Sequence, residues 1–158
     1  MIITTWNRFG LAWRAVADTT RVDLLALLMP IGRDLRRAEE AAAARHGITM
    51  WQYAILAVVD RRSDLNQSEV AARLGYSKNR IVGDLDRLEQ AKLLVRRPGA
   101  DRRANTLAVT PRGRRVMTAI RAEIHRHEDD RLATLSTTTR RAFVAALVEI
   151  NDQLRTSR

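Results

Sequence analysis

The sequence predicts a mainly α-helical protein of the α+β class, in which one short β-hairpin lies between groups of helices. Apolar residues recur at helical spacing in most parts of the 158-residue chain. Two stretches with strand-like character, residues 93–97 and 106–109, flank a loop rich in turn-forming residues. Capping residues (Ser, Thr and Asn) stand immediately before several of the helical stretches.

The first of two short central helices is predicted to begin after Asn66. The Asn66 side chain can cap this helix, and Glu69 stands three residues later, as in a capping box. Apolar residues at helical spacing follow, and Gly75 then ends the helix. These apolar positions are Val70, Ala71 and Leu74.

A second short helix is predicted to begin after Ser77, a favourable capping residue. Ile81, Leu85 and Leu88 fall on one face of it, at i, i+4 and i+7. The opposite face carries Asn79, Arg80, Gly83, Asp86 and Arg87. Two helices joined by a glycine turn, the second with a basic outer face, make a helix-turn-helix, which places its second helix in the major groove of DNA.

A β-hairpin rich in arginine is predicted directly after these helices. Its strands are residues 93–97 and 106–109, with Leu107 and Val109 on one face. The connecting loop, PGADRRAN, contains turn formers and two adjacent arginines. A hairpin in this position is the wing of a winged helix-turn-helix.

The order of these motifs over residues 65–114 resembles the MarR family of winged helix-turn-helix transcriptional regulators. The segments that carry the resemblance are Asp86-Arg87-Leu88-Glu89, Asp101-Arg102-Arg103 and the run LAVTPRGR from Leu107 to Arg114. The chain departs from the family pattern at two positions. Lys92 stands where the family usually has glycine, so the second helix must end without it. Gly83 stands where arginine or threonine is common.

The resemblance implies a DNA-binding transcriptional regulator, more narrowly a ligand-responsive repressor that binds a pseudo-palindromic operator as a homodimer. It also implies that Asp101 braces the wing by pairing with Arg103, which leaves Arg102 to enter the minor groove or meet its flanking phosphates. The expected DNA-contacting residues are Ser77, Lys78, Asn79, Arg80, Gly83, Arg87, Arg96, Arg97, Arg102 and Arg103.

The charge of the chain agrees with a nucleic-acid partner. It has 28 basic and 18 acidic residues, a formal net charge of +10. Residues 77–115 hold eleven of the basic residues and four of the acidic ones. Such a concentration is typical of phosphate binding, whereas genome composition explains arginine replacing lysine but not its clustering on the wing. A non-specific, nucleoid-type architectural DNA-binding protein is the alternative, and the defined reading helix favours the regulator.

Other functional classes find no support in the sequence. There is no cysteine, which excludes disulfides and thiolate metal sites. His125 and His127 are two apart on a predicted helix and point in different directions, and His46 stands alone, so we expect no metal and no cofactor. The sequence has no nucleophile elbow, glycine-rich phosphate loop or carboxylate pair in an apolar frame, so no enzyme activity is expected.

Two acidic residues of the second helix, Asp84 and Asp86, are expected to orient a nearby basic side chain, namely Lys78, Arg80 or Arg87.

The sequence contains no apolar run of membrane-spanning length and no signal-peptide pattern. We therefore expect a cytoplasmic protein with no membrane partner.

The regions on either side of the winged helix-turn-helix (residues 49–110) are expected to form a helical dimerisation region, residues 21–48 and 111–158. Residues 1–20 are expected to form an N-terminal extension, in which Thr5 can cap a short amphipathic helix. Pro30 interrupts a broad apolar stripe, which predicts one bent helix or two abutting ones ending at His46-Gly47. Thr49 and Gln52 form the capping box of a largely buried helix. Its apolar residues are Trp51, Ile55, Leu56, Val58 and Val59.

Two helices follow the wing. The first is capped by Thr110, has Pro111 in its first turn and extends to about His127. The second is capped within residues 136–139. Their apolar stripes would have little cover in a monomer, and a two-fold dimer would bury them. The expected interface residues are Met117, Ile120, Ile124, Phe143, Leu147, Ile150 and Leu154.

The resemblance further implies a cleft between the dimer body and each winged helix, which takes small aromatic acids or lipophilic anions. Aromatic walls and one cation suit such an effector. The candidate residues are Trp13, Arg33, His46, Trp51 and Tyr53, although core or interface packing is the simpler explanation for most of them.

Overall fold

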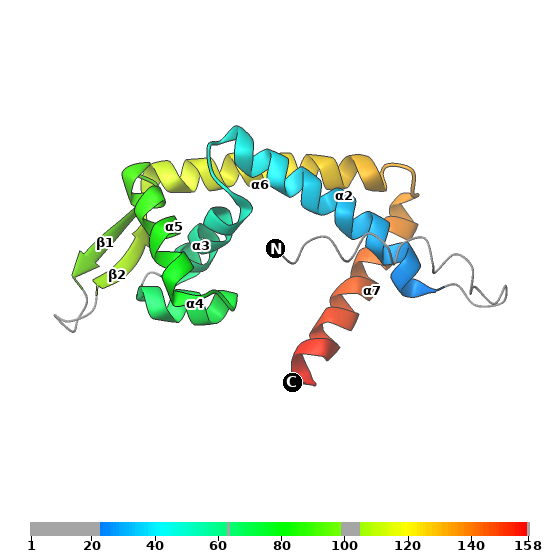
Figure 1. Ribbon diagram of the computed structural model, residues 1–158. Coiled ribbons are helices and arrows are strands. Elements are labelled where there is room, and N and C mark those ends of the chain that lie inside the picture. Colours follow the sequence, from blue (N-terminus) through cyan, green and yellow to red (C-terminus); the bar gives the residue numbers. More distant parts are fainter. Residues whose placement is uncertain (1–22, 63, 99–104, 158) are drawn as a thin grey trace.

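A computed structural model describes residues 23–62, 64–98 and 105–157 (Figure 1). In chain order these residues form α2 (Leu24–Arg45), α3 (Met50–Arg61), α4 (Gln67–Leu74), α5 (Lys78–Gln90), β1 (Leu94–Pro98), β2 (Asn105–Val109), α6 (Pro111–Leu132) and α7 (Thr137–Thr156). The prediction of a mainly helical fold with a winged helix-turn-helix is confirmed. The expectations for Thr5, Trp13, Asp101, Arg102 and Arg103 lie outside the described residues.

Local capping fixes the starts of the central helices as predicted. The Asn66 side chain accepts hydrogen bonds from the backbone N–H groups of Ser68 and Glu69, and the Glu69 carboxylate accepts one from the Asn66 N–H at 2.8 Å. Thr49 and Gln52 form the same reciprocal pair at the start of α3. Both predicted capping boxes are confirmed. Each depends only on residues three apart, so the sequence alone could predict it.

Three helices end in the same way, with one residue in the left-handed conformation. After α2 and α4 that residue is glycine, Gly47 (φ 73°) and Gly75 (φ 61°). After α5 it is Lys92 (φ 58°). The following N–H then bonds back to the helix, as the Leu93 N–H does to the Leu88 carbonyl at 2.9 Å. The second helix thus makes its expected turn without glycine, at a conformational cost that lysine bears and glycine does not.

The core of the winged region is built from α3, α5, the hairpin and α6. Ile55 on α3 and Leu85 on α5 are fully buried, as are Met117 and Ile120 on α6 at 4% and 0% exposure. Met117 and Ile120 were expected at a dimer interface. That expectation is wrong for both, because α6 packs against α3 and β2 of its own chain and buries them there.

The hairpin is antiparallel, with Leu94 opposite Val109 and Pro98 opposite Asn105. Strand β1 begins one residue later than predicted, because Leu93 is still part of the turn that follows Lys92, and β2 begins one residue earlier than predicted. A bridge between Asn66 and Thr106 ties the start of α4 to the second strand. The hairpin is therefore attached to the helix-turn-helix on both sides.

The start of α6 lies against the base of the hairpin. The Thr110 hydroxyl accepts a hydrogen bond from the Gly113 N–H at 2.9 Å and donates one to the Lys92 carbonyl at 2.7 Å. A Cβ atom on Gly113 would come within 2.8 Å of Cγ1 of Val109 and would overlap the Leu93 carbonyl oxygen. Glycine is required here by close approach. The helix continues to Leu132, past the predicted end near His127.

Helix α2 is a single helix in spite of Pro30, which decides between the two predicted arrangements. It lies along the C-terminal half of α6 (Figure 1). Two groups of ion pairs join them. Glu123 binds Arg45 (2.5 Å) and His46 (2.9 Å), and Asp34 binds His127 (2.8 Å) and Arg131 (2.7 Å).

Helix α7 stands away from the rest of the molecule (Figure 1), and it has no buried residue. Its N-cap is Ser136, as predicted. Large apolar side chains are exposed on it, and the N-terminal half of α2 exposes a second group. The exposed apolar residues on these two helices are Leu24, Leu25, Leu27, Leu28, Met29, Ile31, Val144, Val148, Ile150 and Leu154.

The left-handed Lys92 gives a stability prediction. Lys92→Gly should raise the free energy of unfolding by about 1 kcal/mol, because glycine adopts positive φ without a steric cost. The matched control is Gly47→Ala, where nothing lies within 4 Å of the added Cβ but φ is 73°, and a loss of similar size is expected. Urea unfolding followed by circular dichroism measures both. A Lys92→Gly protein less stable than the wild type would show that the lysine side chain stabilises the fold by more than its left-handed backbone conformation costs.

The ion pairs between α2 and α6 give a pH prediction. Hydrogen bonds from Arg131 and then His127 lower the pKa of the Asp34 carboxyl from 3.8 to about 2. Because the pKa is lower in the folded state, the stabilisation is fully present above about pH 4 and is lost as the pH falls toward 2. Asp34→Asn should therefore lower the melting temperature at pH 7.

The difference between the wild-type protein and Asp34→Asn should shrink as the pH falls below about 4. Asp152→Asn, which changes an exposed aspartate on α7, is the control. A difference that stays constant from pH 7 to pH 3 and below would show that the carboxylate charge of Asp34 does not stabilise the fold.

Candidate nucleic-acid interface

The outward face of α5 is exposed from Arg80 to Arg87. Arg80, Gly83, Asp86 and Arg87 all lie on it, as the helical periodicity predicted. Ser77 caps the helix by accepting a hydrogen bond from the Arg80 N–H. The side chains of Lys78 and Asn79 lie outside the described part of the chain. Helix α5 therefore presents basic groups from its first turn to its last, with its N-terminus at the positive end of the helix dipole.

Asp84 has a role that differs from the expected one. It points inward and is 7% exposed, and its carboxylate accepts hydrogen bonds from Nε2 of Gln52 (3.1 Å) and from the Tyr76 hydroxyl (2.7 Å). Arg87 approaches it only to 4.0 Å. The expectation that Asp84 orients outward basic groups is therefore largely wrong. Its position, between Ile81 and Leu85 on the inward face, was the signal in the sequence that could have revealed this.

An aromatic pair lies beside the start of α5. The rings of Trp51 and Tyr76 are 4.8 Å apart, and the Arg80 guanidinium lies 5.3 Å from the centre of the Tyr76 ring. Burial, and then the hydrogen bond to Asp84, raises the pKa of the Tyr76 hydroxyl. Trp51 is 44% exposed, so the expectation that it is buried in α3 is wrong. Its ring packs on Tyr76, not in the core.

Arg96 joins the wing to α5. Its guanidinium binds Asp86 (2.6 Å) and Glu89, and its backbone N–H donates to Glu89 at 3.3 Å. The hydrogen bond to Asp86 is the main cause of the raised pKa of Arg96. Asp86 thus pairs with the wing and not with Arg80 or Arg87. Arg96 was expected to contact DNA, but these two carboxylates occupy its guanidinium; Arg97, the next residue, is exposed.

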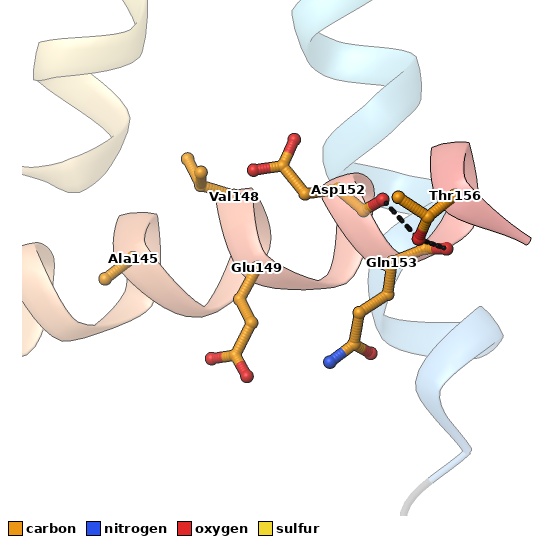
Figure 2. Close-up of a pocket in the computed structure, with 6 residues that line it drawn as sticks. All are labelled: Ala145, Val148, Glu149, Asp152, Gln153 and Thr156. Atoms are coloured by element: carbon orange, nitrogen blue, oxygen red, sulfur yellow. Dashed lines mark hydrogen bonds between the residues drawn. The ribbon is translucent and has the colours of Figure 1, made fainter.

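The four effector-site candidates among the described residues have different surroundings, while Trp13 lies outside them. Arg33 is exposed on α2, and His46 is paired with Glu123. Tyr53 packs partly buried against the core, while Trp51 packs on Tyr76. Two surface hollows involve α7. One is lined by Ala145, Val148, Glu149, Asp152, Gln153 and Thr156 (Figure 2), and the other lies where the end of α6 meets the start of α7. Of the candidates that the structure describes, Arg33, His46, Trp51 and Tyr53, none lines either of these two hollows.

Among residues 23–62, 64–98 and 105–157, no three His, Cys, Asp or Glu side chains come together as metal ligands. Over the same residues, no helix has the length and apolar character needed to cross a membrane.

Known proteins with a similar sequence or fold are transcriptional regulators of one family. A model of the MarR family matches residues 46–104. A candidate transcriptional regulatory protein for the hcr operon of Thauera aromatica is 29% identical over 132 residues, 78% of this chain and 80% of that protein. CouR, a transcriptional repressor solved with a 23-mer DNA duplex, superposes with a TM-score of 0.66 at 28% identity, over 82% of this chain and 92% of CouR.

A MarR family protein of Mycobacterium tuberculosis is also similar in fold. Its complex with DNA superposes with a TM-score of 0.69 at 23% identity, over 82% of this chain and 98% of that one. Its complex with p-aminosalicylic acid gives a TM-score of 0.66 at 24% identity, over 82% and 99% of the two chains.

The contrast between Arg96 and Arg97 can be tested by removing each charge. Arg96→Met should destabilise the fold by about 1 kcal/mol, because its partly buried guanidinium joins two carboxylates across elements. Arg97→Met should leave stability unchanged but weaken DNA binding and reduce the slope of log K against log salt by about 1 per chain. Thermal unfolding and salt-dependent anisotropy measure the two effects. The assignment is wrong if Arg96→Met keeps full stability and loses salt dependence as Arg97→Met does.

Proposed function

We propose that this chain, which is similar in sequence and fold to the MarR family of DNA-binding transcriptional regulators, acts as a ligand-responsive repressor that binds a pseudo-palindromic duplex as a homodimer. The family is one of regulators and not a class of enzymes. The observation that carries the proposal is the exposed basic face of α5, held beside the wing by Arg96. An exposed helix of this kind fits the major groove of DNA, and a wing beside it fits the adjacent minor groove.

In this proposal the DNA contacts come from two elements. Ser77, Lys78, Asn79, Arg80, Gly83 and Arg87 belong to α5 and its cap, and Arg97, Arg102 and Arg103 belong to the wing. Arg80 lies in the first turn of α5, where side chains of a recognition helix reach base edges, so we assign it a base-reading role. Asp101 is assigned to brace the wing. Residues 49–110 then form the DNA-binding region.

The unburied apolar faces support the homodimer. Leu24, Leu28 and Ile31 on α2 are between 47% and 69% exposed, and Ile150 and Leu154 on α7 are 53% and 63% exposed. Apolar faces of this extent in a single chain indicate an association surface. Both helices lie at the end of the molecule away from the wing (Figure 1), so a two-fold contact there leaves both reading helices free. The interface residues proposed are Ile124, Phe143, Leu147, Ile150 and Leu154.

The effector proposed is a small aromatic or lipophilic anion. The similar M. tuberculosis protein was solved with p-aminosalicylic acid, which belongs to this chemical class. Arg33 belongs to α2, His46 caps the C-terminus of α2, and Trp51 and Tyr53 belong to α3. Aromatic and cationic groups of this kind suit an aromatic carboxylate. Trp13 completes the set proposed from the sequence.

The homodimer can be tested by placing a charge on α7. Ile150→Asp or Leu147→Asp should raise the dimer dissociation constant at least about a hundredfold, because each would bury an unpaired carboxylate. Gln153→Asp adds the same charge on the same helix at a polar, exposed position, and should dissociate the dimer much less. Sedimentation or light scattering gives the molar mass. A dimer that survives both apolar-to-Asp changes would show that the interface lies elsewhere.

The regulatory function can be tested with the DNA that flanks the gene for this chain. A site-specific regulator should protect a two-fold sequence with half-sites about one helical turn apart, and keep that footprint in excess random DNA. Addition of p-aminosalicylic acid should weaken the footprint. Protection that disappears with competitor DNA, or that covers the whole fragment, would instead identify the chain as a non-specific architectural protein.

A further inference from the structure

Tyr76 occupies the turn between α4 and α5, and both its backbone and its side chain are fixed. Its backbone N–H donates to the Ala71 carbonyl at 2.9 Å, in the turn formed by Gly75. Its hydroxyl donates to the carboxylate of Asp84 at 2.7 Å. Asp84 lies in the second turn of α5. The ring is therefore held at both ends and has little freedom to rotate away from the start of α5.

The partner of Tyr76 is itself fixed by a hydrogen-bond chain to α3. Asp84 accepts from Nε2 of Gln52 at 3.1 Å, and Oε1 of Gln52 accepts from the Thr49 backbone N–H at 3.0 Å. Gln52 is 4% exposed and Asp84 is 7% exposed, so water competes little for these bonds. The chain Thr49–Gln52–Asp84–Tyr76 thus connects the capping box of α3 to the turn before the reading helix.

The Tyr76 ring lies beside Arg80, with the guanidinium carbon 5.3 Å from the ring centre. A long arginine side chain on a solvent-facing helix has many rotamers, and ordering it for base contact costs conformational entropy. A cation over an aromatic ring removes part of that freedom before DNA arrives. The carboxylate of Asp84 is engaged with Tyr76 and Gln52, and that of Asp86 with Arg96, so the nearby acids do not compete for Arg80.

We propose that Tyr76 is a specificity-determining positioning residue: its ring, oriented by Asp84 and Gln52, holds Arg80 in the conformation that reads bases. This rests on the base-reading role assigned to Arg80 above. Tyr76 acts through Arg80 and makes no base contact in this scheme. Its removal should therefore change which sequences are preferred, and not merely how tightly all sequences bind.

The experiment uses the full chain and a duplex pool with a randomised central segment. The sequences selected by the wild-type protein, Arg80→Ala, Tyr76→Leu and Tyr76→Phe are compared, and Kd is then measured on the duplex that the wild type prefers. Tyr76→Leu should relax preference at the same base positions as Arg80→Ala and weaken binding by about two- to five-fold, the range for an exposed cation–π contact. A variant that combines Arg80→Ala with Tyr76→Leu should relax the base preference no further than Arg80→Ala alone.

Two further variants separate positioning from folding. Tyr76→Phe keeps the ring but loses the hydroxyl that Asp84 orients, so its base preference should fall between those of the wild type and Tyr76→Leu. Ile55→Val, a change in the core away from Arg80, should lower the melting temperature without changing the selected sequences. Loss of preference in Ile55→Val equal to that in Tyr76→Leu would overturn the proposal, and a wild-type preference in Tyr76→Phe would overturn the orienting role of Asp84.

The outcomes also separate this inference from the function on which it rests. A wild-type protein that selects no sequence overturns site-specific binding itself. A wild-type protein that selects a site, with an unchanged preference in Arg80→Ala or in Tyr76→Leu, leaves the regulator in place and overturns the positioning role.

Discussion

The inward face of α5, packed against α3 and the hairpin, is the contact on which the rest of this molecule depends. Ile81, Leu85 and Leu88 are at most 1% exposed, so the helix cannot rotate about its axis without opening the core. The buried Asp84 strengthens that constraint, because a rotated helix would leave a carboxylate without its two donors. The outward direction of Arg80 and Arg87 follows from what is buried on the other side.

The features that sequence could predict are those decided by a few neighbouring residues. The two capping boxes, the glycine turn after α4 and the caps of α5, α6 and α7 each depend on residues within one helical turn. The apolar periodicity of α5 placed its inner and outer faces correctly for the same reason. The sequence showed that Lys92 stands where glycine is usual at the end of α5. Only the structure shows that Lys92 itself adopts the positive φ.

The features that sequence could not predict depend on contacts between distant segments. Met117 and Ile120 have the same spacing as an interface stripe, and only the packing of α6 on α3 shows that their own chain covers them. Arg96 looks like any other arginine of the wing until the fold brings Asp86 and Glu89 beside it. Basic composition therefore overestimates how many arginines are free for phosphate, since some of them hold the protein together.

The length of α6 has a mechanical consequence. Its 22 residues span about 33 Å, from the hairpin to the end where α2 is fastened by ion pairs and α7 begins. In a dimer joined at that end, the helix acts as a lever arm, and a rotation of about 6° at the joint would carry the hairpin end sideways by roughly 3 Å. Successive bases are about 3.4 Å apart along a DNA strand. A small change of angle at the joint would thus misalign the two reading helices by about one base pair.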